Sequence, residues 1–317
     1  MYSEKDLRKV LENWNIESGL PIGDIYIMDG AKVSGSVWTV GTDYILKTDD
    51  REKLMKNLKV AKALSKQGFV SSLPVLTKTG AEYLDGKELF ILTQGLKGNP
   101  LPKSDRFGNN RTDFGKIYGK SIAQLHKALR DVQNEVVPDE VNLYKSITEW
   151  ALPNVRQQNV QWSIGLDEEF FTDYIDTFGK LYEKLPKQLI HRDPNPSNIL
   201  FEGGEVSGFI DFDLSEVNLR LWDACYCATG ILSESGDIEI EAYAKWIDVL
   251  GGILHGYDNE GKLTAEEKQA IFYVICSIQM ICVTYFESRE EFKQLAKTNR
   301  KMFKYIVDNK AQIQQIF

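Results

Sequence analysis

The chain has 317 residues, of which 43% are hydrophobic and 26% charged, a composition typical of a folded globular protein large enough for two lobes. Its formal net charge of -8 argues against nucleic acid as a partner, because neutralising phosphates requires a surplus of Lys and Arg. The polar start, Met1 to Asp6, is not a secretory signal. The longest apolar run, Ile271 to Phe286, is interrupted by polar residues and short for a membrane span. We therefore expect a cytoplasmic protein with no membrane segment, in which this run forms a buried core helix.

The first hundred residues mix helical and strand-like patterns. Ser3 and Asp6 predict a capping box at the start of a short helix. Residues 52–66 have apolar side chains at helical spacing and predict a second helix. Runs rich in β-branched and aromatic residues predict strands at residues 24–28, 36–40, 43–47, 73–77 and 88–93.

Residues 95–110 are rich in Gly, Pro and Asn and predict a linker. Beyond it the pattern is helical. One of the predicted helices is expected to stop at Gly251-Gly252, and another to start at a capping box formed by Thr264 and Glu267. The chain is therefore predicted to be α+β, with a small strand-rich lobe at 1–97 and a larger, mainly helical lobe at 98–317. A cleft between two such lobes is a usual place for a ligand.

The chemistry is concentrated between His191 and Asp223. The segment begins His191-Arg192-Asp193-Pro194-Asn195-Pro196-Ser197-Asn198, and Gly203-Gly204 then separates two apolar runs, the second of which leads to Asp211-Phe212-Asp213. Gly-Gly in this position predicts a two-residue hairpin turn, which would bring Asp211 close to Asn198 and both close to Asp193.

Three converging oxygen-bearing side chains suit phosphoryl transfer. Mg²⁺ prefers oxygen ligands and is usually held by one or two carboxylates plus substrate phosphates. Transfer also needs a carboxylate that accepts the proton of the attacking hydroxyl. The order His-x-Asp-x-x-x-x-Asn, hairpin, Asp-Phe is the arrangement of a kinase catalytic loop. A surface turn that carries Asp, Asn and Pro by chance is the alternative, and the complete set with its spacing argues against it.

On these residues the chain resembles the aminoglycoside phosphotransferase family, which includes choline-kinase-like and homoserine-kinase-like enzymes. The resemblance implies a bilobal protein-kinase-like fold and a kinase that uses ATP and Mg²⁺ to phosphorylate a hydroxyl of a small molecule. It implies Asp193 as the catalytic base, Asn198 and Asp211 as magnesium ligands, and His191 and Asp223 as structural support for the loop. Leu125-His126 is another family-like feature, although His126 alone would be expected only to pack.

The small lobe matches the family less completely. The resemblance implies that Lys47 contacts the ATP phosphates, that Ser34, Gly35 and Ser36 offer backbone N–H groups to them, and that backbone groups of Gln94 and Leu96 bind the adenine. The helix position where the family has a glutamate partner for the lysine is occupied by Asn57. The residue that pairs with Lys47 is therefore an open question.

Two other functions compete with a small-molecule kinase. A protein kinase would have an activation loop and an Ala-Pro-Glu motif after the metal aspartate, but only Phe212 to Trp222 separate Asp211 from Asp223. A non-catalytic nucleotide-binding protein would be expected to lack the base or a metal ligand, and only the missing glutamate favours it. A P-loop enzyme is excluded, because no Gly-x-x-x-x-Gly-Lys-Ser/Thr motif occurs.

The acceptor pocket is expected in the large lobe, from residues 233–286 and 150–161, because that lobe supplies the base. The acids in this region would favour an acceptor that carries an amine. The alternative is that they coat solvated helix faces. An aminoglycoside, homoserine, choline-like amine, sugar or nucleoside analogue all remain open, as do GTP in place of ATP and the oligomeric state. The acids concerned are Glu234, Asp237, Glu239, Glu241, Asp258 and Glu260.

Overall fold

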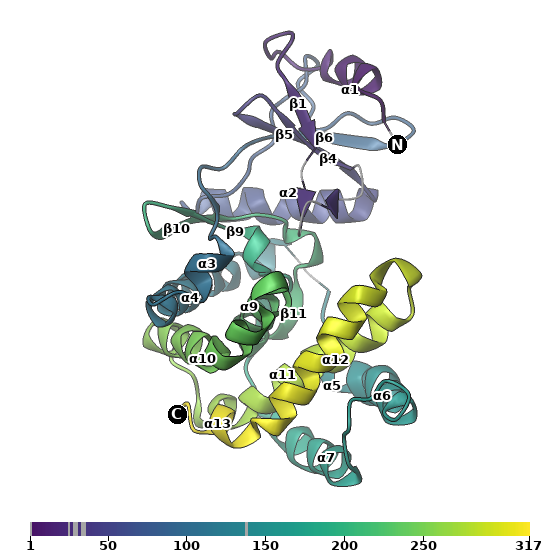
Figure 1. Ribbon diagram of the computed structural model, residues 1–317. Coiled ribbons are helices and arrows are strands. Elements are labelled where there is room, and N and C mark those ends of the chain that lie inside the picture. The colour runs from purple at the N-terminus through teal and green to yellow at the C-terminus, as the bar shows by residue number, and fades with distance from the viewer. Residues whose placement is uncertain (1, 25, 28–30, 33–35, 137–138) are drawn as a thin grey trace. The chain divides into compact units, whose positions relative to one another are not determined.

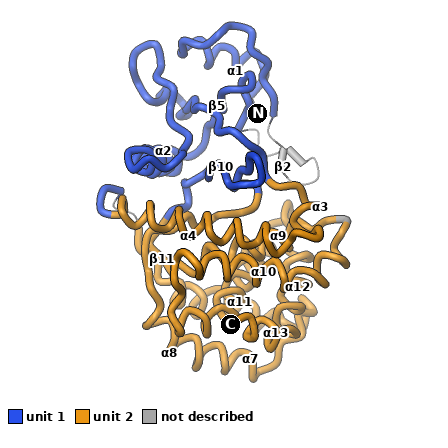
Figure 2. The backbone as a smooth tube through the Cα atoms, turned by 90° about the vertical axis from the view of Figure 1, so that its left-hand side faces the viewer, with its two compact units in different colours: residues 1–100, 134–136, 197–215 blue, residues 101–133, 137–196, 216–317 orange. Residues whose placement is uncertain are grey.

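The computed structural model describes residues 2–24, 26–27, 31–32, 36–136 and 139–317 (Figure 1). Its contacts divide the chain into two compact units (Figure 2). The first comprises residues 1–100, 134–136 and 197–215, and the second comprises 101–133, 137–196 and 216–317. The expected boundary at 97/98 lies close to residue 100. The hairpin after Asn198 was expected in the C-terminal lobe, but it packs with the first unit.

The first unit is built on a four-stranded antiparallel sheet. The strand order is β1-β4-β5-β6, and a separate pair of short strands, β2 and β3, lies between β1 and β4 in sequence. The bounds are Ile22–Asp24 for β1, Tyr26–Ile27 for β2, Ala31–Lys32 for β3, Val37–Val40 for β4, Tyr44–Asp49 for β5 and Leu89–Gln94 for β6.

A helix accompanies each face of this sheet. α1 (Glu4–Leu11) starts at the predicted capping box of Ser3 and Asp6, and its buried leucines join a core with Trp38 and Leu46 of the sheet. α2 (Arg51–Lys66) starts after Asp50, whose side chain accepts hydrogen bonds from the first turn, and packs against Leu89 and Ile91. Because side chains alternate along a strand, Leu46 faces the α1 core and Lys47 points to the other face.

The predicted strand at 73–77 is wrong. This segment makes only isolated bridges, Pro74 with Thr93 and Thr77 with Trp14. Val75 nevertheless donates its N–H to Leu92 and accepts the indole N–H of Trp14 at 2.8 Å. The segment is therefore held at the sheet by a few hydrogen bonds rather than by a regular ladder.

The remaining strands of the first unit form the predicted hairpin. β9 (Ile199–Glu202) pairs with β10 (Glu205–Phe209), and β7 (Asn99–Pro100) adds to the other edge of β9. Gly203 and Gly204 have φ values of 63° and 88°, which glycine adopts without a steric penalty. The hairpin is followed by a short 3₁₀ turn, Phe212–Leu214, that packs on α2.

The second unit is mainly helical, with one antiparallel pair of strands, β8 (Lys187–Ile190) and β11 (Glu216–Leu219). Two π-helical turns, Ile147–Ala151 and Tyr174–Phe178, interrupt its helices. Its helices are α3 (Lys103–Arg106), α4 (Arg111–Val136, whose last turn belongs to the first unit), α5 (Leu143–Ser146), α6 (Leu152–Gln158), α7 (Glu168–Asp173), α8 (Gly179–Tyr182), α9 (Leu221–Ser233), α10 (Glu239–Gly261), α11 (Ala265–Glu287), α12 (Lys293–Asp308) and α13 (Lys310–Gln314).

α11 is the central helix of this unit. It starts at the predicted capping box of Thr264 and Glu267. Within the described parts of the chain it is the one helix long and apolar enough to cross a membrane, and 72% of its apolar window is buried inside the unit. This burial agrees with the prediction of a core helix.

The prediction that Gly251-Gly252 ends a helix is wrong, because α10 continues to Gly261. These glycines instead permit close packing with α4. A Cβ on Gly252 would lie 2.5 Å from the carbonyl oxygen of Thr112, and one on Gly256 would lie 2.2 Å from that of Lys116. Small residues four positions apart allow two helix backbones to approach closely.

Gly119 of α4 makes the closest of these approaches, since a Cβ there would lie 1.9 Å from the Ile253 carbonyl oxygen. We expect Gly119→Ala to lower the free energy of unfolding by about 1–3 kcal/mol through overpacking. Gly251→Ala is the matched control, because nothing lies within 4 Å of its Cβ position. It should raise stability by up to about 1 kcal/mol through helix propensity. Urea unfolding measures both, and equal effects would contradict the packing assigned to Gly119.

Candidate active site

In the first unit, Lys47 pairs with the carboxylate of Asp211. Lys47 lies near the end of β5 on the face that carries α2, and Asp211 follows the β9–β10 hairpin. The side chain of Lys47 is 16% exposed and that of Asp211 36%. The open question of the partner of Lys47 is therefore answered for this structure by Asp211, not by a residue of α2.

Burial and charge act in opposite directions on this pair. Burial lowers the pKa of Lys47, but the carboxylates of Asp211, Asp213 and Asp49 outweigh it, so the net shift is upward and the ammonium group is retained at neutral pH. Burial and the neighbouring Asp211 raise the pKa of Asp213. The result is an ion pair between Lys47 and Asp211 with two further carboxylates, Asp49 and Asp213, near the ammonium group.

Asn57 of α2 occupies the position where a glutamate was expected. Its amide oxygen accepts the backbone N–H of Phe212 at 2.8 Å. The side chain thus holds the residue next to Asp211, which itself has the left-handed φ of 70°. A neutral amide makes this hydrogen bond without adding another negative charge beside Asp211 and Asp213. Neither the periodicity of α2 nor the family pattern indicated this contact.

Asn198 lies at the start of the hairpin that ends near Asp211. Its carbonyl oxygen accepts the N–H of Ile210 at 3.0 Å, so the two predicted magnesium ligands are brought together from opposite ends of the hairpin. The Gly-Gly turn predicted that the two residues lie close together, whereas their role as ligands is what the family resemblance implies. Asp193 belongs to the second unit.

The other residues predicted to bind nucleotide lie in or next to the strands of the first unit, or outside the described residues. Ser34 and Gly35 lie outside the described residues, and the carbonyl oxygen of Ser36 accepts the N–H of Thr48 at 2.8 Å. Gln94 donates its N–H to Leu73 at 3.0 Å, and its carbonyl oxygen accepts the hydroxyl of Ser72 at 2.6 Å. Both backbone groups of Gln94 therefore already have hydrogen-bond partners within the protein.

In the second unit, the loop that carries Asp193 is attached to α9 by Asp223. This fully buried carboxylate accepts the N–H of His191 at 2.8 Å and that of Arg192 at 3.0 Å. A carboxylate that accepts two backbone donors makes charge-assisted hydrogen bonds, which are roughly twice as strong as neutral ones. Asp223 thus makes the contacts that a loop anchor requires, and His191 itself is fully buried beside it.

His126 of α4 completes this anchor. It is almost fully buried, its Nε2 lies 2.8 Å from Asp223, and its Nδ1 lies 2.7 Å from the hydroxyl of Tyr257. For this histidine the expectation of ordinary packing is too modest, because it connects α4 to Asp223, which holds the loop that carries Asp193. The Leu125-His126 pair was the only signal in the sequence.

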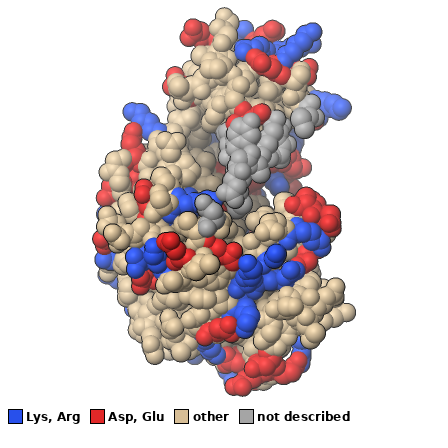
Figure 3. Space-filling model, viewed as in Figure 1, with Lys and Arg blue, Asp and Glu red and all other residues tan. Residues whose placement is uncertain are grey.

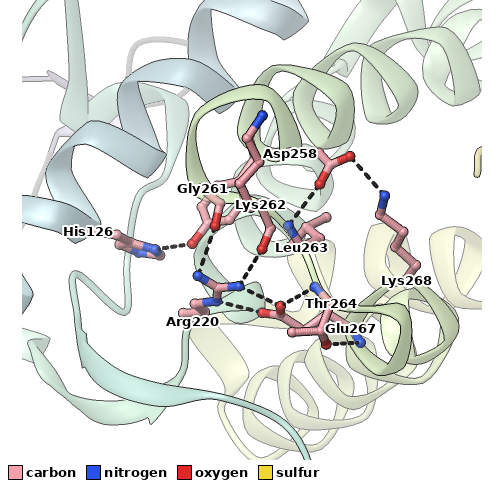
Figure 4. A network of polar contacts seen from close by, with 10 residues as sticks. His126, Arg220, Asp258, Gly261, Lys262, Leu263, Thr264, Glu267 and Lys268 are labelled. Carbon is pink, nitrogen blue, oxygen red and sulfur yellow. Dashed lines mark hydrogen bonds and ion pairs between the residues drawn. The ribbon is translucent and has the colours of Figure 1, made fainter.

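Arg220, directly before α9, forms a second network of polar contacts (Figure 4). Its guanidinium group makes two hydrogen bonds to Glu267, at 2.7 and 2.6 Å, and donates to the carbonyl oxygens of Gly261 and Lys262. The turn between α10 and α11 is therefore tied to the helix that holds Asp223.

The acids expected to favour an amine are mostly paired within the second unit. Figure 3 shows acidic and basic side chains interspersed on the visible face rather than one acidic field. These ion pairs, and not a ligand, account for most of the predicted cluster. The pairs are Glu234 with Arg106, Glu239 with Lys301, Glu241 with Lys245 and Asp258 with Lys268.

Comparison with known proteins decides the family. A model described as the phosphotransferase enzyme family matches residues 29–256, well over half of the chain. The chain belongs to the phosphotransferase enzyme family. The matched region contains every residue that the sequence assigned to catalysis, metal and nucleotide, but not the whole of the expected acceptor pocket.

Relatives of this phosphotransferase family member agree in sequence and fold. The homoserine kinase of Zymomonas mobilis is 24% identical over 252 residues, which cover 77% of this chain and 74% of that protein. A mutant of aminoglycoside 2'-phosphotransferase-IIIa in complex with GDP has a TM-score of 0.68 at 12% identity, covering 98% of this chain and 99% of that one. A microcompartment-associated aminopropanol kinase has a TM-score of 0.65 at 12% identity, with 99% and 100% covered. The α+β, protein-kinase-like fold is thereby confirmed.

Proposed function

We propose that this phosphotransferase is an ATP- and Mg²⁺-dependent kinase that transfers the γ-phosphate to a hydroxyl of a small, amine-bearing molecule. The observation that carries the proposal is the presence of Asp193, Asn198 and Asp211 together within the region that matches the family. A non-catalytic member would be expected to have lost one of them.

The residues of the first unit suit Mg²⁺ and a nucleotide. The carboxylate of Asp211 and the amide oxygen of Asn198 are hard oxygen donors at one end of the same hairpin, which is the chemistry that Mg²⁺ requires. Lys47, held as a cation, suits a phosphate group. When bound, the metal would neutralise charge on the phosphates.

Asp193 has the role of general base in this proposal. Its carboxylate accepts the proton from the acceptor hydroxyl as that oxygen attacks phosphorus. Asp223 keeps the backbone of the loop fixed through the N–H groups of His191 and Arg192. Positioning and charge neutralisation supply most of the catalysis in this class of reaction, because the transferred group needs little covalent help.

The acceptor class follows from chemistry that the relatives share. Homoserine, aminopropanol and aminoglycosides each carry an amino group and a hydroxyl. Because most acids of the second unit are paired with Lys or Arg, the preference for an amine rests on the substrates named for the relatives. We also propose a cytoplasmic location, where ATP is available.

A protein kinase is the less favoured alternative. The short segment between Asp211 and Asp223 is filled by the turn at Phe212–Leu214 and by β11. It therefore leaves no length for a regulatory activation loop of the kind that protein kinases carry.

An acceptor panel tests the proposal. Purified protein, ATP and Mg²⁺ are incubated with L-homoserine, 1-amino-2-propanol, ethanolamine and kanamycin, and ADP formation is measured above the rate without acceptor. The control compounds are the same alcohols without the amine, such as 4-hydroxybutyrate and 2-propanol. We expect at least one amino alcohol to accelerate ADP formation. Equal rates with the amine-free alcohols would contradict the amine preference, and a peptide substrate used in preference to all of them would contradict the small-molecule assignment.

A further inference from the structure

One face of α9 follows the loop that carries Asp193. Residues four apart on a helix lie on the same side, so Trp222, Tyr226 and Gly230 form a single row. The indole N–H of Trp222 donates to the carbonyl oxygen of Arg192 at 3.0 Å. A Cβ on Gly230 would lie 2.9 Å from the ring of Pro196. The row therefore contacts the loop from Arg192 to Pro196 at successive points.

Arg192 is bound to this row by its side chain. The guanidinium carbon lies 3.7 Å from the centre of the Trp222 ring, and the ring of Tyr226 stacks on the same indole at 5.9 Å and 20°. The guanidinium group also forms an ion pair with Glu216 of β11 at 2.7 Å, with both side chains less than one-fifth exposed. A planar guanidinium can stack and form an ion pair at once, which lysine cannot reproduce.

The backbone of Arg192 has a conformation that is unusual for a residue other than glycine. Its φ is 76°, a left-handed conformation that glycine adopts readily and a long side chain does not. Backbone strain of this kind persists when the surrounding structure compensates for it. Backbone hydrogen bonds to Asp223 and Trp222 hold this residue, and the stack on Trp222 and the pairing with Glu216 add contacts that need the side chain of Arg192.

Tyr226 adds a contact to Asp193 itself. Burial raises the pKa of Tyr226 well above its usual value, and the neighbouring Asp193 raises it further through charge and a hydrogen bond from the hydroxyl. The hydroxyl is therefore a donor to the carboxylate at neutral pH. Such a bond restricts the orientation of the Asp193 side chain.

We propose that Arg192 and Tyr226, which both stack on Trp222, are positioning residues that hold the carboxylate of Asp193 in its productive orientation. Arg192 fixes the backbone that precedes Asp193, and Tyr226 fixes the carboxylate. The inference rests on the proposed role of Asp193 as general base. It explains why an arginine occupies a position whose φ suits glycine.

The test compares Arg192→Gly and Tyr226→Phe with wild type, using the amino alcohol that gives the highest rate in the acceptor panel. A misplacement of the base by about 1 Å costs up to about a hundredfold in rate, so we expect kcat to fall about ten- to a hundredfold with the KM for ATP unchanged. Tyr226→Phe keeps the stacked ring and loses only the hydroxyl. Amide hydrogen exchange at the residues of 191–198 other than Pro194 and Pro196 should quicken in Arg192→Gly, while exchange in α11 should not change.

Ser163→Gly is the matched control, because Ser163 also has a positive φ, of 54°, at an exposed position of the same unit. It should leave kcat at the wild-type value. If Arg192 contributes only to stability, Arg192→Gly would change Tm and leave kcat unchanged. Unchanged kcat in both Arg192→Gly and Tyr226→Phe overturns the inference. Asp193→Asn distinguishes failure of this inference from failure of the proposed function. If Asp193→Asn keeps the wild-type kcat, Asp193 is not the general base. If Asp193→Asn loses turnover while Arg192→Gly and Tyr226→Phe keep it, only the positioning role is refuted.

Discussion

Asp193→Asn is expected to lower kcat about a hundred- to ten-thousandfold, the usual contribution of a general base. The amide has the shape of the carboxylate but cannot accept the proton of the attacking hydroxyl. Asp193 is assigned no part in holding nucleotide, so the KM for ATP should stay near its wild-type value. Steady-state kinetics at saturating acceptor measure both quantities.

Asp131→Asn on the exposed side of α4 is the control for a change of charge in the same unit. It should leave kcat and KM unaltered. A parallel loss of ATP affinity and turnover in Asp193→Asn would indicate a structural role for Asp193 and would refute its assignment as the base.

The second large effect is expected for Asp211→Ala. Removing this carboxylate deprives Mg²⁺ of its anionic protein ligand and Lys47 of its partner. Mg-ATP should raise the Tm of the wild-type protein and should fail to raise that of the variant. The measurement is a thermal melt with and without Mg-ATP, in which binding to the native state alone appears as stabilisation.

Asp43→Asn, at an exposed position before β5, is the control within the first unit. Its Tm should respond to Mg-ATP as in wild type. Full stabilisation of Asp211→Ala by Mg-ATP would show that Asp211 is not a ligand, and the proposed metal site would then have to be abandoned.

Local sequence signals predicted much of the architecture. Both capping boxes, α2 and the Gly-Gly hairpin lie where side-chain pattern and turn chemistry placed them. Each depends on residues close together in the chain. The pairing of Asn198 with the segment at Asp211 was predictable because a hairpin joins them through one short turn.

The errors arose where contacts between distant segments decide the structure. Gly252 was predicted to end a helix, but it serves the approach of α4, more than a hundred residues earlier in the chain. The segment at 73–77 has strand-like composition but forms only isolated bridges. No local pattern distinguishes a glycine that ends a helix from one that admits a neighbouring backbone.

The same limit applies to the site. Asn57 departs from the family pattern, and its hydrogen bond to Phe212 depends on a partner far away in sequence. Likewise, the acids of the second unit were expected to attract an amine, and most of them pair with Lys or Arg from other helices. Residue type alone indicates charge, but whether the charge is already neutralised depends on the fold.

The central claim is that the chain transfers a phosphate to a hydroxyl of a small molecule, and ³¹P NMR of the reaction with ATP, Mg²⁺ and an amino alcohol tests it most directly. The account predicts a new phosphomonoester resonance that grows in step with ADP and is absent with Asp193→Asn. Release of inorganic phosphate alone, or a product formed equally by Asp193→Asn, would contradict it.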